Sequence, residues 1–315
     1  MNNKQLVGLV IFGLLVAAVI AWMITPNISL EVVSNRDIAP PLRTKVYNLN
    51  QEVVASIREA DYQQFYSLAT DELEERLKNR VAPEGDYFNR MQKILNRQEL
   101  KESDDHYFRS RFWKKDKVNR KVDSKLFSEP AVVNLGLSNR ETYVSFVPTE
   151  GTSVGHLLSL VYTKQEAGWK LDQFNFRSYT SQGWTALDYY SRARELANNE
   201  FNVTGYLYTS LAEELLPPSE FLQLQDLSKL RNLRRELKQK VVEISYPVEM
   251  KVVDPPIEIF QIQSRNLQDG IAAVIKYRTA TDLEQPAEVE TEAGIIHREI
   301  NAVFPGIKDN FDYIA

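Results

Sequence analysis

The three histidines of this chain stand apart from one another and from any recurring ligand spacing. His106, His156 and His297 form neither an H-x-H nor an H-E-x-x-H pattern, the spacings that bring two imidazoles together on one metal ion. The densest group of potential ligands is Asp104-Asp105-His106. Neighbouring residues in a helix do not share a face, so these three side chains would not converge on one ion. The sequence therefore predicts no metal site and no cofactor.

Nucleophilic catalysis has little support in the residue types. The chain has no cysteine, contains no G-x-S-x-G motif, and lacks the glycine-rich loops that cradle phosphates. A pair of carboxylates remains as a candidate for general acid–base chemistry: Asp61 at a helix junction and Asp172 on a predicted hairpin. Such work requires burial, which raises a carboxyl pKa toward neutrality. Surface carboxylates are far commoner than buried ones.

Positive charge is concentrated in residues 109–125, where basic side chains alternate with aromatic ones. A stretch of this kind can contact an anionic membrane, an anionic polymer or an acidic protein. The alternative is a solvated face, neutralised locally by Asp116, Asp123 and Glu102. The candidate binding residues are Arg109, Arg111, Trp113, Lys114, Lys115 and Lys117.

The N-terminus contains a candidate membrane anchor in residues 6–24, LVGLVIFGLLVAAVIAWMI, which carry no charge. At 1.5 Å per residue this run is about 28 Å long, close to the hydrocarbon thickness of a bilayer. Lys4 precedes it, while Trp22 suits an interface and Pro26 ends the helix. The positive-inside rule places the N-terminus in the cytoplasm and residues 27–315 in a periplasmic or extracellular space. The alternative is a signal peptide cleaved before Trp22.

The composition of the chain is typical of a packed protein. The chain has 315 residues, enough for about two domains, with 43% hydrophobic and 26% charged residues. These values exclude general disorder and a polytopic membrane protein. The net charge of -5 gives no field that favours nucleic acid, so none is expected as a partner. Without cysteine there are no disulfides and no thiolate chemistry.

The elements after the anchor are organised as helices followed by strands. We expect a tether over residues 27–44, helices from residue 45 to about 100, and strands over residues 131–137, 142–147, 157–163 and 169–179. This order resembles the NTF2-like (cystatin-like) fold over residues 45–180, with READYQQFYSLATDELEERL at 58–77 and the closing strand GWKLDQFNF at 168–176. The resemblance implies helices packed on a curved sheet, around a cavity that Asp61 and Asp172 would face.

Residues 184–242 are expected to form a helical hairpin and a basic helix. The stretch 184–219 resembles a single tetratricopeptide hairpin, with the small residues Ala193, Gly205 and Ala212 where the two helices approach. Two plain connecting helices are the alternative interpretation. A basic helix is expected over residues 227–242. Residues 248–315 are predicted to be a small α+β domain with a turn at Asp269-Gly270.

Two functions are compatible with these patterns. The first is a single-pass, membrane-anchored binding or assembly protein outside the cytoplasm and without catalytic activity, which follows from the anchor and the missing catalytic motifs. Its partner would be a protein or an anionic surface. The second is an NTF2-like hydrolase or isomerase that uses Asp61 and Asp172. An α+β fold, preceded by residues 1–26 as membrane anchor, is common to both.

Overall fold

The computed structural model describes residues 14–16, 30–80, 86–110, 118–127, 131–136, 141–151, 153–224, 227–242, 244, 246–251, 256–279 and 284–315. The expected anchor, residues 6–24, lies outside the described residues except for Leu14, Leu15 and Val16, which are helical and exposed. Among the helices that the described residues form, none has the length and hydropathy needed to cross a bilayer.

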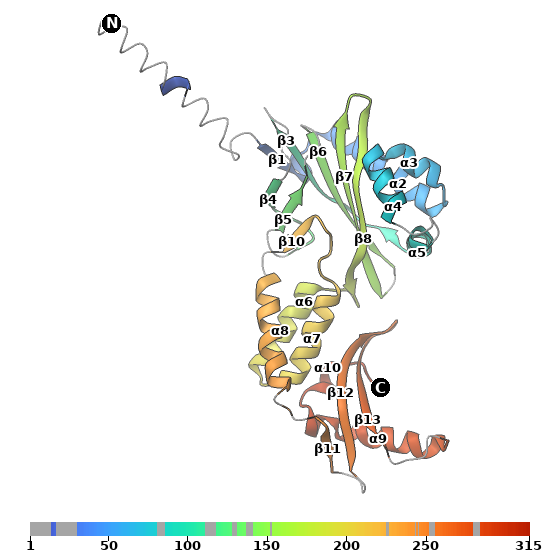
Figure 1. Ribbon diagram of the computed structural model, residues 1–315, viewed down its shortest axis with the longest axis vertical. Helices are drawn as coiled ribbons and strands as arrows, with labels where there is room; N and C mark the ends of the chain where they lie inside the picture. The colour runs from blue at the N-terminus through green and yellow to red at the C-terminus, as the bar shows by residue number, and fades with distance from the viewer. Residues whose placement is uncertain are drawn as a thin grey trace, which may run out of the picture.

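A curved antiparallel sheet with helices on one face forms the N-terminal part of the molecule (Figure 1). The strands follow the order β1-β3-β6-β7-β8-β9, and β2 pairs with β6. This arrangement confirms the expected α+β class. The strands are β1 (Leu30–Ser34), β2 (Glu99–Leu100), β3 (Asp104–Ser110), β6 (Glu141–Glu150), β7 (Val154–Gln165), β8 (Gly168–Ser181) and β9 (Trp184–Thr185).

Four helices cover one face of this sheet: α2 (Pro40–Arg58), α3 (Tyr62–Leu68), α4 (Asp71–Arg80) and α5 (Asp86–Leu95). Local signals fix their starts. Asp61 accepts a hydrogen bond from the Gln64 N–H at 2.9 Å, and the Thr70 hydroxyl accepts one from the Leu73 N–H at 3.2 Å. The last of these helices ends at Leu95 rather than near residue 100, because residues 99–100 pair with β6 as β2.

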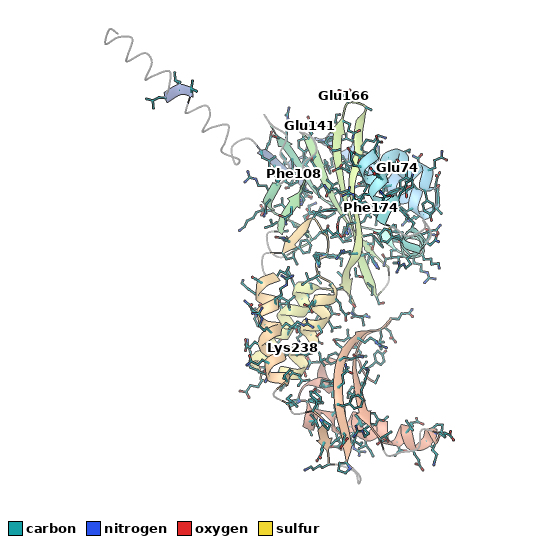
Figure 2. The ribbon with its side chains drawn as sticks, in the orientation of Figure 1. Glu74, Phe108, Glu141, Glu166, Phe174 and Lys238 are labelled. Atoms are coloured by element: carbon teal, nitrogen blue, oxygen red, sulfur yellow. The ribbon has the colours of Figure 1, made fainter. Side chains whose placement is uncertain are left out.

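The space between these helices and the sheet is filled by side chains. Phe65 stacks edge-on with Phe88 and Phe174, and all three lie on the helix side of the sheet. Phe174 of β8 and Phe108 of β3 are labelled in Figure 2, and they belong to the two different cores on opposite faces. The core on the helix side also contains Tyr143, Tyr162 and Trp169.

The expected tether at residues 27–44 is wrong for residues 30–44. Leu30 to Ser34 form β1, which pairs with β3, and η1 (Asn35–Asp37) leads into α2, with Pro40 in its first turn. Leu30 and Val32 pack against the core on one face of the sheet, and Val33 packs against the core on the other face. This burial on both faces stabilises the segment as a strand. Pro40 suits the first helical turn, because that position needs no N–H donor.

A second, three-stranded sheet covers the other face. Its order is β10-β5-β4, formed by β4 (Val118–Val122), β5 (Ala131–Leu135) and β10 (Leu222–Leu224). The first two strands come from the charged region and the segment after it. Strand β10 comes from the segment after the helical hairpin, so that segment returns to the N-terminal unit.

Three helices follow the sheets: α6 (Ala186–Asn198), α7 (Asn202–Glu214) and α8 (Leu227–Val242). A Cβ added at Gly205 would lie 3.1 Å from the Ala193 carbonyl oxygen, so the small residues do permit close approach of α6 and α7, as expected. Leu237 of α8 also lies against Gly205.

The C-terminal part is a four-stranded sheet with two helices. The strands run in the order β11 (Val248–Met250), β12 (Ile257–Asn266), β13 (Ile271–Arg278) and β14 (Tyr313–Ile314), accompanied by α9 (Pro286–Val303) and α10 (Ile307–Asn310). The hairpin helices and this sheet share one hydrophobic core. The hairpin thus buries its apolar face against the C-terminal sheet.

Candidate functional site

A pocket of about 550 Å³ opens between η1, the first half of α2, the segment before β3 and the end of β6. Its walls come from segments far apart in the sequence, which β1 and β3 bring together by pairing. The lining residues are Asn35, Arg36, Arg43, Thr44, Tyr47, Asn50, Gln51, Lys101, Glu102, Ser103, Asp105, Lys125 and Val147.

Asp105 forms the acidic part of the pocket wall. It is 7% exposed, and its two carboxylate oxygens accept hydrogen bonds from different hydroxyls: Oδ1 from Ser145 at 2.7 Å and Oδ2 from Ser103 at 2.9 Å. Behind it the chain of hydrogen bonds continues. Asn50 Nδ2 donates to Ser145 Oγ at 2.8 Å, and the Tyr162 hydroxyl donates to Asn50 Oδ1 at 2.8 Å. This network fixes the carboxylate in one orientation.

A second buried carboxylate, Asp104, points to the opposite face because side chains alternate along a strand. It accepts hydrogen bonds from Ser124 Oγ at 2.5 Å and Asn35 Nδ2 at 2.8 Å, and His106 Nε2 lies 3.5 Å away. Burial alone would raise the pKa of Asp104, but the contacts with His106, Ser124 and Asn35 together hold it below its ordinary value.

Asn35 connects the two carboxylates. While its amide nitrogen donates to Asp104, its amide oxygen accepts from the Asp105 backbone N–H at 3.0 Å. Its φ of 53° is left-handed, a conformation that Asn tolerates better than most residues. The turn after β1 therefore positions both the pocket wall and the neighbouring Arg36.

Four cations line the pocket, and two of them are neutralised by carboxylates. Lys125 Nζ lies 2.7 Å from Glu102, and Lys101 forms an ion pair with Glu150. The hydrogen bond and charge of Lys125, with smaller contributions from Arg36 and Arg43, hold the pKa of Glu102 below its usual range.

The other two cations are guanidinium groups that act on Glu102 only through their charge, without a close ion pair. Arg36 is exposed and Arg43 half-buried, and neither guanidinium forms a hydrogen bond or a close ion pair with another described residue. A guanidinium presents five N–H donors in a planar fork that matches carboxylate and phosphate groups. The rim of the pocket is therefore prepared to receive an anion.

The carboxylates expected to be catalytic do not line this pocket. Asp61 is exposed and caps α3. Asp172 lies in β8 beside the start of α4, where Thr70 Oγ1 approaches its Oδ1 at 3.5 Å and Arg76 donates to its backbone carbonyl at 2.7 Å. Both residues therefore lie at the N-termini of helices. The carboxylates that line the pocket are Asp105 and Glu102.

Of the expected basic binding residues, only Arg109 is described. It is exposed in β3, opposite Glu31 of β1 and Glu141 of β6. Arg111, Trp113, Lys114, Lys115 and Lys117 lie outside the described residues.

The other two histidines are separate from this pocket. His156 stacks on Phe176 with ring centroids 4.8 Å apart, and its Nδ1 lies 3.2 Å from Gln98. Burial lowers the pKa of His156 to about 4, so the ring is neutral near pH 7. His297 is exposed on α9. Among the described side chains, no three potential ligands gather in a metal-binding arrangement.

The fold and pocket define an α+β protein with a polar, partly cationic ligand-sized pocket. Comparison with protein-family models, curated proteins and solved structures gave no match.

Sequence reasoning missed this pocket because it considered Asp104, Asp105 and His106 as neighbours in a helix, whereas they lie in strand β3. In a strand, Asp104 and His106 share one face and Asp105 takes the other, so the Asp-Asp-His group divides between two environments. The available signal was the alternation in Asp104–Ser110, where Tyr107 and Phe108 also occupy opposite faces.

Proposed function

We propose that this chain is a single-pass, membrane-anchored binding protein outside the cytoplasm, and that its pocket binds an anionic ligand. The two free guanidiniums of Arg36 and Arg43 at the pocket rim carry the proposal. Both guanidiniums line one pocket, and a bound anion would supply the counter-charge that neither has as a close ion pair.

Binding without catalysis is favoured by how the interior is occupied. An NTF2-like fold, which we include in the proposal, places helices over the concave face of a curved sheet. Here that space is filled by Phe65, Phe88, Tyr143, Tyr162 and Trp169. The alternative of a hydrolase or isomerase relies on Asp61 and Asp172, which occupy different helix starts and line no part of the pocket.

Anchoring at a membrane is part of the proposal. Leu14, Leu15 and Val16 are exposed by 66, 60 and 41% as consecutive apolar residues, which favours burial in lipid. Strand β1 begins six positions after residue 24, and six residues span at most about 20 Å. The pocket would therefore stay close to the outer surface of the membrane. The basic segment 109–125 would provide a further contact with an anionic surface or an acidic protein.

Binding of simple anions to the full chain in detergent tests the pocket. We expect inorganic phosphate to bind, and the double variant Arg36→Gln/Arg43→Gln to weaken that binding by about tenfold or more, since each charged hydrogen bond contributes about 1.5–3 kcal/mol. Titration calorimetry measures both affinities.

The matched control is Arg265→Gln, which removes an exposed guanidinium from β12, far along the chain from the pocket lining. It should leave the affinity for phosphate unchanged. Equal affinities for the wild type and the double variant would contradict the proposed site.

A further inference from the structure

Asp105 is a buried carboxylate without a cation. Among the described residues, no Lys, Arg or His nitrogen lies within 4.0 Å of it, and its partners are the neutral hydroxyls of Ser103 and Ser145. An ionised carboxylate offers about four acceptor positions, of which these hydroxyls occupy two. Buried charges are normally paired, because desolvation is costly when no opposite charge compensates it.

The groups around Asp105 leave at least one of its acceptor positions open to the pocket. Asn50 cannot supply a donor, because its amide nitrogen is engaged by Ser145 and its amide oxygen by Tyr162. The Tyr143 hydroxyl, buried and without another hydrogen-bond partner among the described residues, lies close enough to Asp105 to donate to its carboxylate and take one acceptor position. Burial, followed by the nearby Asp105 carboxylate, raises the pKa of Tyr143, so it remains a neutral phenol.

The lining of the same pocket also contains groups that attract an anion. The two free guanidiniums lie on the same lining. The pocket therefore combines a buried anionic wall with a cationic rim, and a ligand with a single charge would satisfy only one of them.

We infer that Asp105 receives the ammonium group of a zwitterionic ligand whose carboxylate or phosphate lies at Arg36 and Arg43. This inference rests on the proposed function, because it assigns the second half of the ligand bound by the same pocket. The ligand class is a compact molecule with one anionic group and one primary ammonium. A free amino acid or phosphoethanolamine fits this description, and so does the phosphoethanolamine headgroup of a membrane lipid.

Matched pairs of probes test the inference on the wild-type chain without any substitution. Phosphoethanolamine and propyl phosphate differ only in ammonium against methyl, and so do β-alanine and butyrate. We expect the ammonium member of each pair to bind about tenfold or more tightly, since it adds charge-assisted hydrogen bonds to Asp105. Equal binding within both pairs would overturn the inference.

The variant Asp105→Asn then assigns the ammonium preference to this residue. It should abolish the preference, so that phosphoethanolamine and propyl phosphate bind the variant with equal affinity. A preference that persists in a folded Asp105→Asn protein would overturn the inference. If that variant does not fold, Ser103→Ala is the substitute: it removes one hydroxyl that holds Asp105 Oδ2, and it should reduce the ratio of the affinities for phosphoethanolamine and propyl phosphate.

The outcomes separate the two proposals. Equal binding of ammonium and methyl probes that still depends on Arg36 and Arg43 would overturn only the zwitterion inference. Absence of binding by all four probes would overturn the anion pocket as well. The source of the ligand follows from the bilayer: if the lipid headgroup occupies the pocket, soluble phosphoethanolamine binds more weakly in phosphatidylethanolamine nanodiscs than in phosphatidylcholine nanodiscs.

Discussion

Two consecutive aspartates in β3 have different roles because the strand turns them to opposite faces. Asp104 is fully buried and satisfied by Ser124, Asn35 and the backbone N–H of Lys125, and it holds the turn after β1 against the second sheet. Asp105 shares the burial but faces the pocket. One residue therefore stabilises the site, while its neighbour is available to a ligand.

The stabilising role of Asp104 predicts a pH-dependent effect of Asp104→Asn. Because contacts in the folded state hold the pKa of Asp104 below its unfolded value, the ionised carboxylate stabilises the fold above the unfolded pKa of about 3.9. That contribution is lost as the pH falls through the lowered folded pKa. We expect the variant to be about 2 kcal/mol less stable at pH 7, since Asn retains one acceptor but loses the charge.

The free energy of unfolding in urea, measured from pH 7 down to pH 3, checks this prediction. The difference between wild type and Asp104→Asn should narrow below about pH 4. Asp123→Asn, at an exposed position one residue after β4, is the matched control and should change stability by less than about 0.5 kcal/mol. A difference that stays constant over this pH range would contradict the assignment.

Among the elements, the helical hairpin depends on close contact between α6 and α7. Ala193 and Ala212 are fully buried, and the contact of Gly205 with the Ala193 carbonyl shows that the helix backbones nearly touch. Helices normally stay 8–10 Å apart, at a distance set by the side chains between them. Small residues at these positions therefore determine the packing of the pair.

Ala193→Leu is expected to destabilise the protein by about 1–3 kcal/mol, because three added carbons must displace packed atoms. Ala293→Leu on the exposed side of α9 is the matched control, and its effect should be small because both residues favour helix. Thermal unfolding followed by circular dichroism compares the two variants. Equal melting temperatures would mean that α6 and α7 do not depend on this contact.

The elements also show which features the sequence determines locally. The helix over Leu227–Val242 and the hairpin of β7 and β8 were predicted from periodicity and turn residues, and they are confirmed. Gly168, with a φ of 137°, marks the hairpin turn. These features depend on residues within one turn or one strand of each other, so sequence patterns report them well.

Features that depend on distant pairing were not predicted. β1 is a strand because β3 lies beside it, and β10 pairs with β5 across about ninety intervening residues. The pocket depends on the same pairing, since Asn35 and Asp105 meet only when β1 and β3 are joined. Asp61 and Asp172 were plausible from residue type alone, but local helix starts account for both.

At the scale of the whole molecule, the helical hairpin links the two ends. One continuous core joins α6, α7 and α8 to the C-terminal sheet, while β10, between α7 and α8, pairs with the N-terminal unit. Ser181 at the end of β8 also donates to the side chain of Asn266 in β12 at 2.7 Å. These contacts connect the pocket-bearing unit to the C-terminal unit.

Placement of this molecule at a membrane gives the final prediction. A reporter joined after residue 40 should be exported and should remain in the membrane fraction after alkaline washing, because residues 6–24 are long enough to span a bilayer and the positive charge precedes them. Leu15→Arg places a charge at the centre of this segment, where it costs about 2.5–3.5 kcal/mol, and should reduce membrane insertion. Recovery of a soluble product that begins near Trp22 would instead identify a cleaved signal peptide. The pocket would then act free of the membrane, which would favour a soluble zwitterion over a lipid headgroup as its ligand.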